Sequence, residues 1–168
     1  MSGFYAEIIP CEGIVLDGKK VLLGMAKEEI ISLLGEPQIV RNSFYYYANE
    51  LRFDFDESGC VEFIEFLGGI DGRLKPQIYG ISVFDTVFDI VYATLWENNG
   101  REYMDIENGH CHVFDKIGIR IYREFTHKDF EKNLRAMKAE GIPFENYVDY
   151  EADKRKAFHW DTIGIGRV

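Results

Sequence analysis

The most constraining feature of this chain is a change of hydrophobic period in its first third. Over residues 27–34 the apolar positions form one stripe at helical spacing, and Gly35 with Pro37 ends that segment. Over residues 51–56 apolar and charged residues alternate strictly, which predicts a strand with one buried and one polar face. A short helix followed by antiparallel strands is therefore expected, which is typical of an α+β fold.

The same succession of elements is predicted twice. A first unit over about residues 14–67 begins with a hairpin around Asp17-Gly18 and continues with the helix and with strands near 44–47, 51–56 and 61–66. A loop at 68–73 leads to a second unit over about residues 79–123, with a helix from Val87 to Leu95 capped by Asp85 or Thr86 and strands near 101–106, 110–114 and 117–122. Residues 124–168 add a helix after Thr126 and a strand near 158–166. We expect one domain over residues 1–168: tandem helix-plus-antiparallel-meander repeats that form a concave sheet, with an additional C-terminal helix.

Charge narrows the classes of partner. Lys and Arg total 19 against 29 Asp and Glu, a net charge of -10, which argues against nucleic acid and anionic membranes and favours a basic protein. No apolar run approaches the length of a membrane span, and the first residues lack the basic and apolar segments of a signal peptide. The three cysteines are widely spaced and odd in number, which fits a reducing compartment. We expect a cytoplasmic location.

The helix and its flanks resemble a known family of repeats. Gly24 to Pro37, with a Gly-x-Pro ending, followed by the strand at 51–55, is similar to the opening of the repeats in the β-lactamase inhibitor protein and in the small lipoprotein of the outer-membrane assembly machinery. The match is good over residues 24–66 and poor over 80–122. The chain departs from the lipoproteins because it lacks a signal and a lipobox cysteine at its start, which favours a cytosolic binder over an envelope role.

The whole layout also resembles bacterial immunity-type proteins, with two repeats, a helix and a tail that holds Trp160 and Gly164-Ile165-Gly166. Both resemblances imply a sheet that grips a partner protein. The leading hypothesis is an immunity protein that occludes a toxin by stoichiometric binding, with no turnover and no cofactor. A basic toxin domain is the candidate partner.

One patch of residues suits such an interface. Tyrosines offer stiff contact area with a hydrogen-bonding tip, and the run at 45–47 must turn at least one ring outward. The polar face of the neighbouring strand supplies a charged rim. The candidate interface residues are Tyr45, Tyr47, Arg52, Asp54 and Asp56. The alternative is that this face packs under the C-terminal helix.

A second hypothesis is chemical. His110 and His112 share one face of a predicted strand, as two metal ligands do, although a polar strand face with Cys111 turned into the core explains them too. Asp54 and Asp56, near Glu62 or Glu65, could hold Mg²⁺ or act as acid and base, although a solvated sheet face is the simpler interpretation. The sequence contains no nucleophile-elbow, phosphate-loop or zincin motif. A small metal-dependent hydrolase or a ligand-sensing module is therefore the alternative to a non-enzymatic binder.

Overall fold

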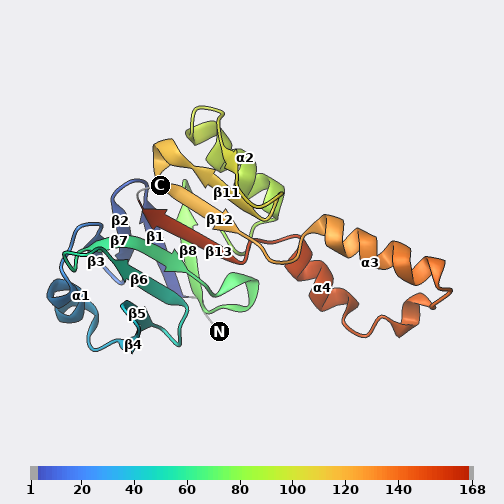
Figure 1. The fold of residues 1–168 in the computed structure, drawn as a ribbon, viewed down its shortest axis with the longest axis horizontal. Coiled ribbons are helices and arrows are strands. Elements are labelled where there is room, and N and C mark those ends of the chain that lie inside the picture. Colours follow the sequence, from blue (N-terminus) through green and yellow to red (C-terminus); the bar gives the residue numbers. More distant parts are fainter. Residues whose placement is uncertain (1–3, 167–168) are drawn as a thin grey trace.

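The computed structural model describes residues 4–166, in which strands form two sheets that share one apolar core (Figure 1). The smaller sheet has the order β3 (Lys19–Leu22), β2 (Gly13–Leu16), β1 (Phe4–Ile9), β8 (Leu74–Ile78) and β9 (Ile81–Ser82). The larger sheet has the order β10 (Met104–Asp105), β11 (Cys111–Phe114), β12 (Ile119–Tyr122), β13 (Thr162–Gly166), β7 (Val61–Phe66), β6 (Leu51–Phe55), β5 (Ser43–Tyr46) and β4 (Gln38–Val40). Only β1 and β8 pair in parallel within this part of the chain.

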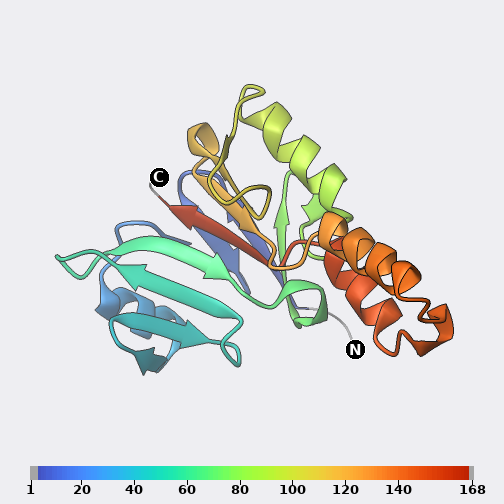
Figure 2. The ribbon, with the colours of Figure 1, turned by 45° about the vertical axis from the view of Figure 1, so that its right-hand side comes forward.

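Four helices accompany the sheets over residues 4–166: α1 (Lys27–Leu34), α2 (Phe88–Asn98), α3 (His127–Ala139) and α4 (Tyr150–Ala157). Buried side chains of α1 and α2 belong to the shared core, namely Ile30, Val91 and Leu95. The pair α3 and α4 leaves the body between β12 and β13 and projects from it as an arm (Figures 1 and 2).

Strand register separates the two faces of the larger sheet. One row of directly paired residues is buried throughout and faces the core: His112, Ile121, Ile163, Phe66, Leu51 and Tyr46. The adjacent row, displaced by one residue, lies on the opposite face: Val113, Arg120, Gly164, Glu65, Arg52 and Tyr45. Because successive side chains of a strand point to opposite faces, we call the side that bears this second row the outer face.

Elements with strong local patterns are confirmed. The helix at 27–34 ends at Gly35, whose φ of 87° suits glycine. The strand at 61–66 is present with the expected bounds. Thr126 is the N-cap residue of α3, and its hydroxyl accepts a hydrogen bond from the backbone N–H of Asp129. The α+β class is thus confirmed.

Several expectations of detail are wrong. Neither Asp85 nor Thr86 caps α2, because the helix begins after Val87 and the carboxylate of Asp85 instead binds Lys75. The strand expected at 101–106 contains only Met104 and Asp105. Residues 145–157, which show little pattern, contain α4, so the C-terminal extension is a helical pair rather than one helix. Helix followed by antiparallel strands occurs after α1 and again after α2, but the strands of both groups join one sheet only through β13.

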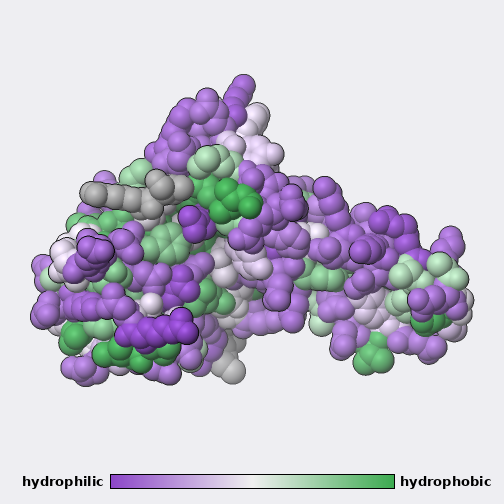
Figure 3. Space-filling view, in the orientation of Figure 1, coloured by the Kyte–Doolittle hydropathy of each residue, from purple (hydrophilic) through white to green (hydrophobic). Residues whose placement is uncertain are grey.

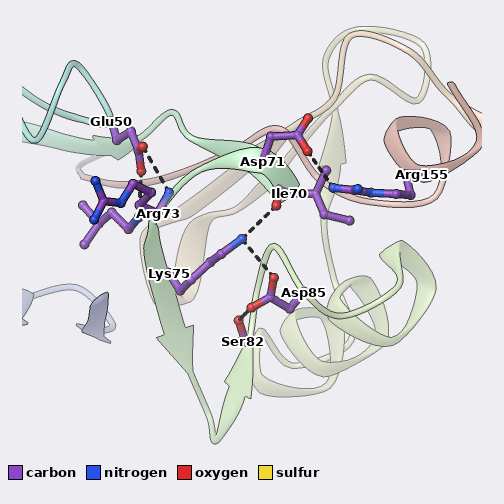
Figure 4. A network of polar contacts seen from close by, with 9 residues as sticks. Glu50, Ile70, Asp71, Arg73, Lys75, Ser82, Asp85 and Arg155 are labelled. Carbon is purple, nitrogen blue, oxygen red and sulfur yellow. Dashed lines mark hydrogen bonds and ion pairs between the residues drawn. The ribbon is translucent and has the colours of Figure 1, made fainter. Parts of the chain in front are cut away.

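A network of polar contacts holds the segment between β7 and β8, which separates the strands that follow α1 from those that follow α2 (Figure 4). The carboxylate of Glu50 accepts hydrogen bonds from the backbone N–H groups of Arg73 at 3.1 Å and Leu74 at 2.7 Å. Because Glu50 is half-buried and bridges the β5–β6 turn to β8, its two oxygens connect the larger sheet to the smaller one. Charge-assisted bonds of this kind are stronger than neutral ones.

The same network reaches the arm. Lys75 donates to the carbonyl of Ile70 at 2.9 Å and pairs with Asp85 at 2.9 Å, while Arg155 of α4 pairs with Asp71 at 2.6 Å (Figure 4). The loop after β7 is thus connected through Lys75 to Asp85, which follows β9, and through Arg155 to the base of the arm.

We expect Glu50→Gln to lower the free energy of unfolding by about 1–2 kcal/mol, because an amide keeps only one oxygen for two backbone donors and carries no charge. Urea denaturation measures this change. Glu57→Gln, in an exposed turn, is the matched control. Equal effects of the two substitutions would contradict the bridging role of Glu50.

Candidate functional site

An open groove of about 1250 Å³ borders the outer face where β6 and β13 end and β7 and β12 begin. Its walls come from the larger sheet, from the β1–β2 turn and from the residues at the end of β3. The lining residues are Cys11, Glu12, Leu22, Leu23, Gly24, Arg52, Asp54, Asp56, Val61, Glu62, Phe63, Asp115, Arg120 and Gly166. Five carboxylates and two guanidinium groups are among them, so the groove carries a net negative charge.

Arg52 organises the charges on the outer face. Its guanidinium contacts Glu65 at 2.8 Å and Asp54 at 3.1 Å, and Tyr45 is its paired neighbour on β5. Burial acts to lower the pKa of Arg52, but the two carboxylates outweigh it and the pKa is raised. The second oxygen of Asp54 accepts a hydrogen bond from the hydroxyl of Ser43 at 2.6 Å. These contacts hold the side chains of Arg52 and Asp54 in fixed positions on the outer face.

Asp54 and Asp56 are expected on one face of a single strand, but only Asp54 lies in β6. β6 ends at Phe55, and the Asp56 carboxylate accepts hydrogen bonds from the backbone and hydroxyl of Ser58 and from the backbone N–H of Cys60. These bonds lower the pKa of Asp56 and commit its carboxylate to the turn. Asp56 still lines the groove, but as a structural residue of its rim.

A bulge gives the groove another carboxylate. The register of β6 and β7 shifts between Asp54 and Phe55, so that Phe55 pairs with Val61 while Asp54 pairs with Phe63. Glu62 is therefore the extra residue, and it is exposed at the groove. Of the two acids expected beside Asp54, Glu65 meets Arg52 and Glu62 lines the open rim.

The ring of Phe63 lies across two glycines of β13. A Cβ atom added to Gly164 would lie 2.2 Å from the ring, and one added to Gly166 would lie 2.5 Å from it. Arg120 covers the same ring, with its guanidinium carbon 5.6 Å from the centroid. Sequence reasoning missed Phe63 and Arg120. The alternating Gly164 and Gly166 were the available signal, because glycine inside a strand often marks a close neighbour.

Tyr47 lies away from the other candidates. Its backbone has a φ of 53° in the turn after β5, and its ring packs against Phe4 with a centroid distance of 5.4 Å. Its pKa is raised by burial and by nearby Asp17. The structure therefore brings Tyr45, Arg52 and Asp54 together on the outer face and places Tyr47 beside β1.

The histidines do not face the outer carboxylates. His112 belongs to the core-facing row and lies among Tyr92, Tyr103 and Trp160, with ring distances of 5.4–5.6 Å. Burial lowers the pKa of His112, an effect that Arg123 adds to and Asp105 opposes. It is His112, not Cys111, that turns toward the core.

His110 and Cys111, the neighbours of His112 along the chain, do not form a metal site with other residues of the described chain either. Nδ1 of His110 contacts the carbonyl of Arg123 at 2.9 Å, and Cys111 lies in the outer-facing alternation although it is buried. Over residues 4–166 no three or more His, Cys, Asp or Glu side chains are grouped to hold a metal. The geometry thus separates the two halves of the expected hydrolase site, with Asp54 on the outer face and His112 on the inner one.

Comparison with protein-family models, with curated proteins and with solved structures finds no match. Within residues 4–166, none of the helices has the length and apolar character needed to cross a membrane.

We expect Gly164→Ala to lower the free energy of unfolding by about 1–3 kcal/mol, because the new methyl group would overlap the Phe63 ring. In a Phe63→Ala background the same change should cost much less. A double-mutant cycle measured by urea denaturation isolates this coupling. If the two changes were additive, the ring would not require the glycine.

We expect His112→Phe to remove part of the pH dependence of stability. Because the pKa of His112 is lowered in the folded state, the unfolded chain takes up a proton below about pH 6.5 while the folded chain resists it. The stability that neutral, buried His112 contributes to the folded state is therefore fully present above about pH 6.5 and is lost as the pH falls below it. Relative to the phenylalanine variant, the wild type should lose up to about 1.4 kcal/mol per pH unit between pH 6.5 and the lowered pKa. Parallel stability curves from pH 7.5 to 5 would contradict this.

Proposed function

We propose that this chain is a protein-binding module that occludes its partner stoichiometrically through the outer face and groove, as an immunity protein covers a toxin. The observation that carries the proposal is a pre-organised, mixed-charge surface: Tyr45, Arg52 and Asp54 are held in register beside a groove with a net negative lining. Such a surface recognises a folded basic partner through electrostatic complementarity and needs no reacting group.

Arg52 and Arg120 are the two cations that line the groove. Their Nε atoms are buried and have no hydrogen-bond partner within residues 4–166, so a partner cannot reach these two donors. Arg120 also makes no ion pair in that part of the chain, and its planar guanidinium rests on Phe63. Arginine supported by an aromatic ring is a frequent hot-spot arrangement, which supports a role for Arg120 at the centre of the contact.

The groove acids supply selectivity. Glu62 and Asp115 are exposed at the groove, whereas Asp54 shares the single charge of Arg52 with Glu65. A basic partner gains from these exposed carboxylates, while an acidic competitor is repelled by them. The proposed target is therefore a basic protein domain such as a toxin, and the proposed place of action is the cytoplasm.

The test begins with affinity capture from lysate of the chain's own organism and production of the dominant partner in pure form. Calorimetry should give a one-to-one complex that weakens as salt is raised. Tyr45→Ala with Glu62→Lys should weaken it at least tenfold, about 1.4 kcal/mol, and should abolish protection if the partner is toxic to cells.

The matched control is Glu57→Lys, an equal charge change in an exposed turn outside the groove lining. This variant should bind as the wild type does. A pure partner whose affinity is the same for the control and the double variant would place the contact elsewhere, and the absence of any stoichiometric partner would overturn the binding role.

A further inference from the structure

The arm ends in apolar side chains that the rest of the described chain does not cover. Val148 is 92% exposed, Phe144 57% and Ile142 39%, and all three lie in the connection between α3 and α4. Figure 3 shows apolar surface at the far end of the arm, surrounded by hydrophilic residues. We call residues 140–153 the arm tip.

The arm tip is an ordered surface. The Phe144 ring packs edge-on against Tyr150 with a centroid distance of 4.5 Å, and the Tyr147 hydroxyl donates to Asp153 at 2.6 Å. Phe130, the buried residue of α3, contacts both tyrosine rings and so joins the tip to the base of the arm. The Phe144 ring, held by this contact, loses little conformational entropy on binding.

Charge is distributed unevenly along the arm. The tip contains no Lys or Arg, and its acidic residues are Glu140, Glu145, Asp149, Glu151 and Asp153. The remainder of α3 and α4 contains the basic residues Lys128, Lys132, Arg135, Lys138, Lys154, Arg155 and Lys156. Apolar side chains therefore project from an acidic surround at the end of a basic stem.

We propose that the arm tip is a second docking surface, which fits a protein that presents an apolar pocket rimmed by Lys and Arg. Phe144 and Val148 fill the pocket, and the surrounding carboxylates face the basic rim. Nucleic acid is disfavoured because its phosphates would meet the tip carboxylates. The basic stem of a second copy has no large exposed apolar side chain, so docking of the tip on that stem would leave Phe144 and Val148 uncovered. This inference goes beyond the proposed function, since it concerns a different surface.

A library of short random peptides displayed on phage, selected against the full chain, tests the chemistry of the pocket directly. The enriched peptides should combine bulky apolar residues with Lys or Arg. A synthetic consensus peptide should bind less tightly as salt is raised. Phe144→Ser with Val148→Ser should reduce its affinity at least tenfold, and Glu145→Gln with Glu151→Gln should reduce both the affinity and the salt dependence.

Ile39→Ser with Val40→Ser is the matched control, because these residues of β4 are also exposed apolar side chains, at 59% and 46%. It should leave peptide binding unchanged, as should the groove variant Tyr45→Ala with Glu62→Lys, which separates the fate of this proposal from that of the proposed function. The inference would be overturned by acidic or uncharged consensus peptides, by equal binding to the tip variant, by a library without enrichment, or by self-association that the tip variant abolishes.

Discussion

The larger sheet depends on the pairing of β13 with strands far away in sequence. β13 is hydrogen-bonded to β12 on one side and to β7 on the other, and all of its pairs are antiparallel. Without it, the strands that follow α1 and those that follow α2 would be two separate sheets with two exposed edges. Ile163 and Ile165 add apolar side chains to the shared core, while Gly164 and Gly166 leave room for Phe63 on the outer face. One short strand thus completes both the core and the groove.

This pairing also explains where the arm is anchored. The chain leaves β12, forms α3 and α4 and must return beside β12 to form β13, so the base of the arm meets the body. Arg123 lies there, stacked on Phe88 and Trp160 and donating to the carbonyl of Ala157. Burial lowers the pKa of Arg123 to about 10, and Asp161 opposes that shift. A buried cation held by rings and a helix-end carbonyl fixes the direction in which the arm projects.

Elements whose formation depends on neighbouring residues could be predicted from the sequence. The signals for the helix at 27–34, the strand at 61–66 and the helix after Thr126 each lie within a few positions, and each element is found as expected. The alternation over residues 51–55 likewise predicted that Arg52 and Asp54 share one face of β6, and the two side chains form an ion pair there.

Features that depend on contacts between residues far apart in the sequence could not be predicted in this way. The place of β13 between β12 and β7 depends on partners about 40 and 100 residues away, as in Ile163 with Ile121 and with Phe66, and no periodicity encodes that choice. The sequence pattern predicts a polar strand face around His112, but all four residues of β11 are buried, so both of its faces are covered. The sequence shows little apolar pattern for α4, because five of its eight residues are charged and its inner contacts come from Tyr150 and the small Ala157. The αL turn at Tyr47 rotated that ring out of the alternation.

Charge is distributed differently over the body and the arm. Residues 127–157 contain equal numbers of basic and acidic side chains, so the net charge of -10 resides on the rest of the chain. The basic stem lies next to that acidic body, where Arg155 pairs with Asp71 and Lys156 acts on Asp161. Attraction at the base and an acidic tip at the far end both favour an arm that stays anchored while its tip points away. If one rigid basic partner spans both proposed surfaces, negative potential attracts it at the groove and at the arm tip, and the two contacts strengthen each other through effective concentration.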